Sequence, residues 1–284
     1  MSNTSLDISG KIDTETVAIY RALADISQRL NVPFLVIGAT ARDTVLHYGH
    51  GTPIQRATTD VDFAVQVATW QEFEQVKQQL VDAGFKKTDK LYRLASPNNT
   101  QTDIVPFGGL QENAQEIAFP PKGDFVMNVL GFDEALAHAE WVRVDDNPEL
   151  VIQVATPEGI TLMKLVAWTD REYEKRSKDA LDLGYLLSTY ENIPSVNDAI
   201  WADHDLMERY EWEPVVASAY WLGKQCRTLS SDATAALVLN LLTDQLGDGR
   251  RFDQLYGSAE QGVMIAAVEV DLIFEAFKAG YSEG

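Results

Sequence analysis

Two aspartates stand two residues apart in a β-forming stretch, residues 58–65. Side chains two apart in a strand project from the same face, so Asp60 and Asp62 are expected to lie together. Two carboxylates held side by side require a cation, and a third acid, Asp103, follows in a second predicted strand, residues 102–107. Mg²⁺ takes oxygen ligands and usually shares its site with phosphate oxygens. The spacing therefore predicts a Mg²⁺ site and phosphoryl chemistry at these three acids.

Nucleotidyl transfer is the phosphoryl reaction that such a site would serve. An attacking oxygen displaces pyrophosphate from the α-phosphorus of a nucleoside triphosphate, and two metal ions can stabilise the attacking and leaving oxygens together. We expect Asp60 and Asp62 to bridge the metals. Asp103 would complete the metal on the nucleophile side and help to accept the proton of the attacking hydroxyl.

A glycine turn precedes the acidic pair. Residues 34–37 indicate a short buried strand, and Gly38-Ala39-Thr40 then leads into a predicted helix, residues 41–48, with Thr40 as its cap. Backbone N–H groups and the dipole at the start of a helix attract anions, and glycine lets the chain approach a ligand closely. The turn is therefore predicted to bind a triphosphate, with Thr40 donating its hydroxyl.

Three charged residues flank the turn and the acidic pair. Arg42 is expected to approach phosphate, and Asp43 to anchor the turn. Arg56, which lies just before the acidic pair, is a further candidate for phosphate binding.

Each of these features also has a plain structural explanation. Acids two apart are common on an exposed edge strand. A Gly-Ala-Thr sequence is an ordinary strand-to-helix turn, and Asp103 alone carries no signal. It is the order of turn, acidic pair and later strand acid that favours one joint site.

The order of these motifs is typical of a known group of enzymes. The glycine turn with Arg42-Asp43 is followed by Arg56-x-x-Thr59-Asp60-x-Asp62-Phe63 and then by Asp103. In this respect the chain resembles the nucleotidyltransferase superfamily related to DNA polymerase β, and within it the AbiEii/AbiGii-type toxins, over residues 33–190. The resemblance implies a nucleoside triphosphate substrate with Mg²⁺ and an antitoxin partner. It also assigns nucleotide-site roles in the helical half to Lys164, Arg171 and Lys178-Asp179-x-x-Asp182.

The physical pattern of the helical half agrees with those roles. On a helix from Thr156, Lys164 and Arg171 are seven residues apart and share a face, so both cations are expected to point toward the triphosphate, with Lys164 as its main contact. Asp179 would orient a cation or position the nucleophile, with Lys178 beside it. The alternative is that the charged stretch around Lys178 is simply a solvated helix surface.

One residue departs from the superfamily pattern. The glycine turn usually reads Gly-Gly or Gly-Ser, whereas this chain has Ala39. The change removes a hydroxyl from the turn and leaves phosphate binding to backbone N–H groups and Thr40. It favours the alternative function, a non-catalytic nucleotide-binding or protein-interaction module with a degenerate fold.

The elements that must position these residues divide the chain in two. Up to residue 155 the pattern alternates strands and helices, and from residue 156 to 284 it becomes helical. We therefore expect an α+β fold: a small mixed sheet with flanking helices, in a nucleotidyltransferase-like domain over residues 1–155, followed by a helical domain over residues 156–284 that completes the nucleotide site.

Composition limits the partners. The chain has 284 residues and a formal charge of −20, so a long polyanion would be repelled and any RNA acceptor, tRNA included, needs a local basic patch. A protein hydroxyl stays open as the acceptor. The single cysteine, Cys226, fits a reducing compartment. The polar N-terminus and the lack of a long apolar stretch predict a cytoplasmic protein without a membrane span.

Overall fold

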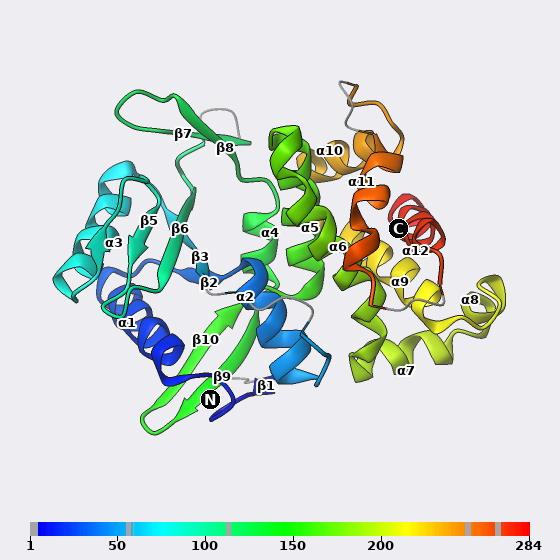
Figure 1. Cartoon of the computed structure of the whole chain (residues 1–284), viewed down its shortest axis with the longest axis horizontal. Coiled ribbons are helices and arrows are strands. Elements are labelled where there is room, and N and C mark those ends of the chain that lie inside the picture. Colours follow the sequence, from blue (N-terminus) through cyan, green and yellow to red (C-terminus); the bar gives the residue numbers. More distant parts are fainter. Residues whose placement is uncertain (1–4, 55–57, 59, 112–114, 248–250, 265–267) are drawn as a thin grey trace. The chain divides into compact units, whose positions relative to one another are not determined.

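The computed structural model describes residues 5–54, 58, 60–111, 115–247, 251–264 and 268–284, and they form two compact units. The first unit comprises Met1–Gly49 and Arg56–Thr156, and the second comprises His50–Gln55 and Pro157–Gly284. Figure 1 shows the sheet in the first unit and helices in the second. The prediction of an α+β fold, with a mixed sheet and flanking helices followed by a helical half, is confirmed.

The first unit is built on a mixed sheet. Its described strands follow the order β1-β9-β10-β2-β3-β6-β5-β4, and a separate ribbon is formed by β7 and β8. Strand β3 runs parallel to β6 and antiparallel to β2, while β5 runs antiparallel to β6. The strands are β1 (Leu6–Asp7), β2 (Phe34–Val36), β3 (Val61–Val67), β4 (Lys86–Lys87), β5 (Arg93–Ala95), β6 (Gln101–Gly108), β7 (Glu116–Phe119), β8 (Phe125–Asn128), β9 (Glu140–Asp146) and β10 (Glu149–Val154).

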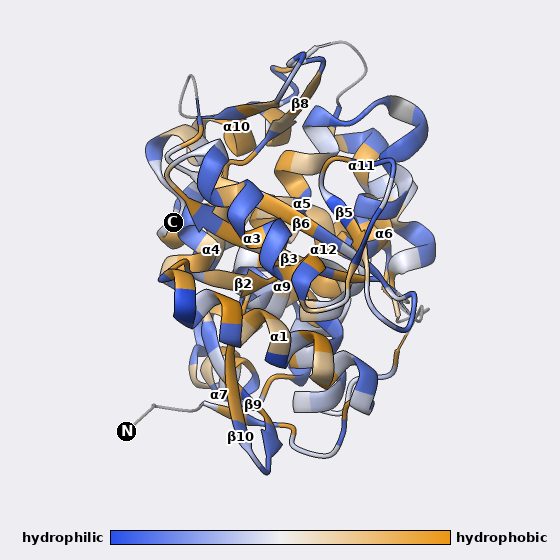
Figure 2. Ribbon diagram, turned by 90° about the vertical axis from the view of Figure 1, so that its left-hand side faces the viewer, coloured by the Kyte–Doolittle hydropathy of each residue, from blue (hydrophilic) through white to orange (hydrophobic). Residues whose placement is uncertain are grey.

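Strand β3 lies inside the sheet, between β2 and β6, and the alternate residues on one of its faces are apolar. Val61, Phe63 and Val65 are almost fully buried, and they share one face of the strand. Asp62 and Gln66, at the intervening positions, are only half-buried. Figure 2 shows the hydrophobic character of β2, β3 and β10 against the largely hydrophilic outer turns of α1 and α3. The strand thus supports a core on one face, and its other face carries Asp62 and Gln66 on either side of the buried Ala64.

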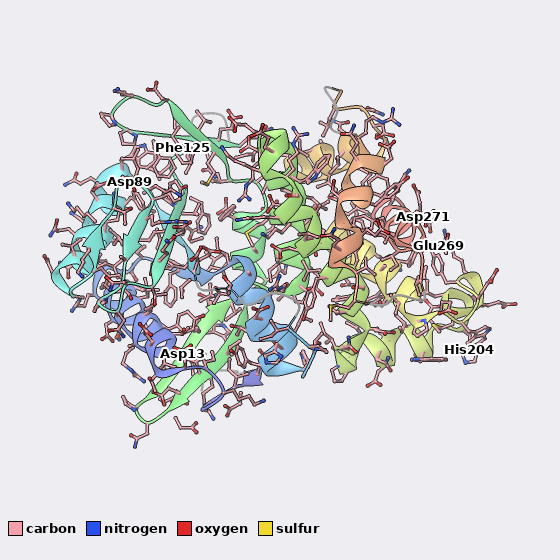
Figure 3. The ribbon with its side chains drawn as sticks, viewed as in Figure 1. Asp13, Asp89, Phe125, His204, Glu269 and Asp271 are labelled. Carbon is pink, nitrogen blue, oxygen red and sulfur yellow. The ribbon has the colours of Figure 1, made fainter. Side chains whose placement is uncertain are left out.

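Helices accompany the sheet in the first unit. Helix α1 begins after Asp13, labelled in Figure 3, whose carboxylate accepts hydrogen bonds from two backbone N–H groups of its first turn. It ends at Asn31, which has the left-handed backbone conformation typical of a helix end. The helices are α1 (Thr14–Leu30), α2 (Gly38–Arg42), a π-helical segment (Asp43–Gly49), α3 (Trp70–Asp82) and α4 (Phe132–Ala137).

The second unit consists of packed helices. Helix α5 contacts α6, α9 and α10, and α12 packs along α9. Helices α9 and α12 come close where Gly223 faces Gly280, since a side chain at either glycine would collide with the backbone of the other helix. The helices are α5 (Pro157–Asp170), α6 (Ser177–Thr189), α7 (Pro194–Ala202), α8 (His204–Arg209), α9 (Pro214–Leu229), α10 (Asp232–Leu242), α11 (Phe252–Ala259) and α12 (Val270–Glu283), with 3-10 turns at Tyr173–Lys175, Tyr190–Asn192 and Glu260–Gly262.

No helix in the described ranges has the length and apolar composition needed to cross a bilayer.

Candidate active site

Three neighbouring strands of the first unit bring charged side chains into one row. Asp62 on β3 is the register partner of Asp103 on β6, and Asp103 is in turn the partner of Arg93 on β5. Residues directly opposite each other in adjacent strands project from the same face of the sheet. The row therefore runs Asp62, Asp103, Arg93, and Asp60 lies two residues before Asp62, just outside the start of β3. The sheet thus brings two of the three predicted acids into direct register.

The glycine turn is fastened to the same strand. The Ile37 backbone N–H donates to the Asp62 carbonyl at 3.0 Å, and the Thr40 hydroxyl donates to the Asp60 carbonyl at 2.8 Å. Gly38 has a φ of +67°, and a Cβ there would lie within 3.1 Å of the Asp62 Cβ and closer still to a carboxylate oxygen. The turn and the acidic pair therefore form one structural unit, with the Asp62 carboxylate lying over Gly38.

The predicted helix start is wrong by three residues. Helix α2 begins at Gly38, so Thr40 lies inside the helix and does not cap a helix from Ala41. Its hydroxyl donates to the Asp60 carbonyl because the turn packs directly against the strand. Ala39 and Thr40 are both buried.

Arg42 and Asp43 form a buried pair at the end of α2. The Arg42 Nε lies 2.8 Å and its Nη2 2.7 Å from the Asp43 Oδ1, and the two side chains are 1% and 8% exposed. Asp43 thus anchors Arg42, whose guanidinium lies inside the first unit. Arg56, the other predicted phosphate ligand in this region, lies outside the described residues.

Arg93 is a member of the row that the sequence alone did not identify. Its Nη2 donates to the Asp103 Oδ2 at 2.7 Å, its Nε donates to the other carboxylate oxygen, and its Nη1 donates to Gln101. The hydrogen bonds with Asp103 raise the pKa of Arg93 above its ordinary value. The sequence contains Arg93 ten residues before Asp103, but strand pairing is not visible in a single sequence.

The donor chemistry of the acids suits a divalent cation. Asp60, Asp62 and Asp103 offer only carboxylate oxygens, which are the ligands that Mg²⁺ and Mn²⁺ prefer. In the described part of the chain no three metal-binding side chains converge as a closed site. Asp103 faces Arg93 with both of its oxygens.

A second charged cluster lies within the helical unit. The Lys164 Nζ on α5 lies 2.7 Å from the Asp182 Oδ2 and 3.1 Å from the Asp179 Oδ1, both on α6. Arg171, which follows α5, reaches the other oxygen of Asp179 at 2.8 Å. Lys164 and Arg171 therefore both contact the Asp179 carboxylate, in agreement with their seven-residue spacing. Lys178, the third predicted cation, is exposed.

Burial strengthens the electrostatic interaction of Lys164 with Asp179 and Asp182. The Asp179 side chain is fully buried and that of Lys164 is 16% exposed. Burial by itself lowers the pKa of Lys164, but the carboxylates of Asp182 and Asp179 outweigh it and raise the pKa above its ordinary value. Lys164 therefore carries a firmly held charge, and Asp182, the last residue of the motif that the resemblance identified, is one of its two partners.

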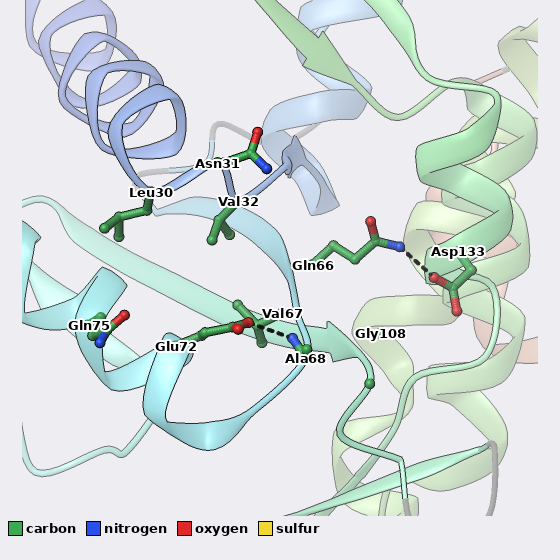
Figure 4. A pocket seen from close by; sticks show the side chains of 11 residues that line it. Leu30, Asn31, Val32, Gln66, Val67, Ala68, Glu72, Gln75, Gly108 and Asp133 are labelled. Carbon is green, nitrogen blue, oxygen red and sulfur yellow. Dashed lines mark hydrogen bonds between the residues drawn. The ribbon is translucent and has the colours of Figure 1, made fainter.

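A cavity of about 700 Å³ lies at the opposite end of β3 and β6 from the acidic pair. Figure 4 shows two carboxylates among its lining residues, and both are already hydrogen bonded. Gln66 donates to Asp133 at 3.1 Å, and the Ala68 backbone N–H donates to Glu72 at 2.7 Å. The cavity is therefore separate from the row of acids and offers no comparable cluster of charged groups.

Gly38→Ala is expected to damage the turn more than backbone strain alone. The positive φ costs about 1–2 kcal/mol for a residue with a Cβ, and the new methyl group must also displace the Asp62 carboxylate. The matched control is Gly10→Ala, since Gly10 has a φ of +74° and no atom lies within 4 Å of the point that its Cβ would occupy. Denaturant unfolding should show the larger loss for Gly38→Ala. Equal losses would show that the contact with Asp62 is unimportant.

Comparison with known proteins places the chain in a family. The family model described as "Nucleotidyl transferase AbiEii toxin, Type IV TA system" matches residues 21–217, which include both charged clusters. The chain belongs to this family. AbiEii membership confirms the resemblance inferred from the motifs, and it identifies the chain as a nucleotidyltransferase toxin of a type IV toxin–antitoxin system. No curated protein matches the chain.

Solved structures of nucleotidyltransferases are similar to the AbiEii chain at low sequence identity. An antigenic nucleotidyltransferase-like protein from Paracoccidioides brasiliensis is 14% identical, with a TM-score of 0.38, and covers 74% of this chain and 94% of that chain. The antibiotic-resistance factor ANT(2'')-Ia is 16% identical, with a TM-score of 0.33, over 70% and 98% of the two chains. The Thermotoga maritima CCA-adding enzyme complexed with tRNA is 15% identical, with a TM-score of 0.26, over 96% and 82%.

Proposed function

We propose that this AbiEii-family chain transfers a nucleoside monophosphate from a nucleoside triphosphate to a hydroxyl of an RNA acceptor, tRNA among the candidates. The observation that carries the proposal is the register of Asp62 on β3 with Asp103 on β6, together with the hydrogen bond that fastens the glycine turn to Asp62. In the reaction, the acceptor oxygen bonds to the α-phosphorus as the bond to pyrophosphate breaks, and the hydroxyl proton passes to Asp103.

The proposed residues divide into two roles. Asp60, Asp62 and Asp103 would hold Mg²⁺, which supplies positive charge for the attacking and leaving oxygens. In the first unit the proposed phosphate ligands are Gly38, Ala39, Thr40, Arg42 and Arg56. In the helical unit they are Lys164, Arg171 and Lys178, with Asp179 orienting the cations.

An RNA end is favoured as the acceptor by a local basic strip. Lys86 and Lys87 on β4 and Lys90 in the segment that follows are all exposed, and β4 pairs with β5, which carries Arg93. In a chain with a formal charge of −20, this strip is where phosphates of a short RNA end would be attracted. The type IV toxin–antitoxin family also leads us to propose an antitoxin protein as partner.

One experiment tests the reaction and its acceptor together. The purified chain is incubated with each α-labelled nucleoside triphosphate, Mg²⁺ and cell lysate, and labelled RNA is then separated from labelled protein. We expect label in small RNA, lost on ribonuclease treatment. Label in protein would overturn the RNA acceptor but keep the transferase. Nucleotide binding without transfer to any acceptor would instead support the non-catalytic nucleotide-binding module that Ala39 suggests.

A further inference from the structure

Arg93 occupies the position where a cation would meet Asp103. Its guanidinium bonds to both Asp103 oxygens, one of them at 2.7 Å, in the fork-to-carboxylate geometry that gives arginine its strongest ion pairs. The two side chains are 18% and 19% exposed, so water screens the pair only partly. A divalent cation that binds Asp103 must therefore compete with a charge already in place.

The register of the sheet places Arg93 next to the acids of the proposed metal site. Arg93, Asp103 and Asp62 occupy matched positions on β5, β6 and β3, and neighbouring strands lie about 4.8 Å apart. A cation at Asp62 and Asp103 would thus lie within a few strand spacings of the guanidinium. At that separation two positive charges repel each other appreciably in a partly buried site.

We propose that Arg93 is an additional residue of the catalytic centre, which competes with a divalent cation for Asp103 and so controls the occupancy of the nucleophile-side metal position. With Arg93 on Asp103, only Asp60 and Asp62 would be available to hold a cation. If Arg93 left Asp103, that carboxylate would become available as a ligand, and the guanidinium could bind an anionic group such as a phosphate of the substrate. The proposal rests on the metal-dependent transferase proposed above.

The test is the affinity for Mn²⁺ in the absence of nucleotide, measured by calorimetry and by the Mn²⁺ electron paramagnetic resonance signal. Arg93→Gln is expected to bind Mn²⁺ about tenfold more tightly than the unmodified chain, because one repelling charge is removed and Asp103 becomes available. Arg93→Lys, which keeps the charge without the two-pronged hydrogen bond, should lie between the two. Equal affinity in the unmodified chain and Arg93→Gln, or weaker binding by Arg93→Gln, would overturn the proposal.

Two further variants assign the gain to Asp103. In the double variant Arg93→Gln/Asp103→Asn the tighter binding should disappear; if it persists, the extra Mn²⁺ is bound at other acids and the proposal fails. Arg21→Gln is the matched control, since Arg21 pairs with Asp145 at 2.6 Å in the same unit but outside the row. It should leave Mn²⁺ affinity unchanged, and a gain as large as that of Arg93→Gln would show a mere effect of net charge.

The outcome is separable from that of the proposed function. If no acceptor is labelled by the unmodified chain, the transferase proposal fails, while a gain in Mn²⁺ affinity that depends on Asp103 would still establish the competition. If transfer occurs and Arg93→Gln leaves Mn²⁺ binding unchanged, the transferase stands and the role of Arg93 fails. Thermal unfolding of each variant verifies that it is folded before its affinity is compared.

Discussion

Asp62→Asn is expected to reduce nucleotidyl transfer by about a thousandfold or more. It removes a carboxylate that would hold the cation, and that cation would stabilise the negative charge that develops in the transition state. Asp62 lies over Gly38 and is the register partner of Asp103, so it links the glycine turn to the row of charged residues. Asparagine keeps the shape of the side chain, and the fold should therefore be retained. Asp60→Asn is expected to have a similar effect. The measurement is the initial rate of label transfer to the acceptor identified above.

The matched control for both variants is Asp25→Asn. Asp25 is an exposed acid of the same unit, on helix α1 rather than in the row of acids or the basic strip. It should transfer label at the unmodified rate, and all three variants should unfold at nearly the same denaturant concentration. Transfer at an undiminished rate by either Asp60→Asn or Asp62→Asn would rule out the acidic pair as the metal-binding centre.

Lys164→Met is expected to destabilise the helical unit by about 3–5 kcal/mol, the usual cost of removing one partner from a buried ion pair. Lys164 is the cation that faces both Asp179 and Asp182, and these carboxylates are almost fully buried. Without it, Asp182 loses its 2.7 Å ion pair, and Asp179 is left with the half-exposed Arg171 to balance its charge. Urea unfolding followed by circular dichroism measures the loss.

An exposed ion pair in the same unit gives the comparison. Lys175 lies 2.8 Å from Glu172, but the two side chains are 68% and 77% exposed. Lys175→Met should therefore cost less than about 1 kcal/mol, because water screens the pair. If the two variants lost similar stability, burial would not be the source of the Lys164 effect.

The pH dependence of this contribution has a definite sign. The pKa of Lys164 in the folded chain lies above its ordinary value of 10.5, so the folded state binds the proton more tightly than the unfolded state. The stabilisation is therefore complete below pH 10.5 and is lost as the pH rises through the folded pKa. The difference in unfolding free energy between the unmodified chain and Lys164→Met should be constant near neutral pH and shrink above pH 10.5. A difference that grew with rising pH would contradict the assignment.

Local periodicity predicts only relations within one segment. The two-residue repeat of a strand relates Asp60 to Asp62, and helical spacing relates Lys164 to Arg171. That both cations reach Asp179 on α6 is a relation between segments, which the spacing alone did not contain. The α+β fold class followed from the change in pattern along the chain, from alternating strands and helices to helices alone.

Relations between distant strands could not be predicted in the same way. The pairing of β3 with β6 skips over β4 and β5 in the chain, so neither the register of Asp62 with Asp103 nor the position of Arg93 is contained in a local pattern. The start of α2 was misplaced because Thr40 was a suitable capping residue, whereas packing against Asp60 decided its role.

The close approach of α9 and α12 at Gly223 and Gly280 sets a limit on how the chain can be shortened. The family match ends at residue 217, inside α9, but α9 also packs against α5, which carries Lys164. Deleting the last helix would uncover the buried face of α9, including the side chains beside Gly223, and so weaken the support of α5. The described residues beyond the match, 218–247, 251–264 and 268–284, are thus an integral part of the helical unit rather than a detachable tail.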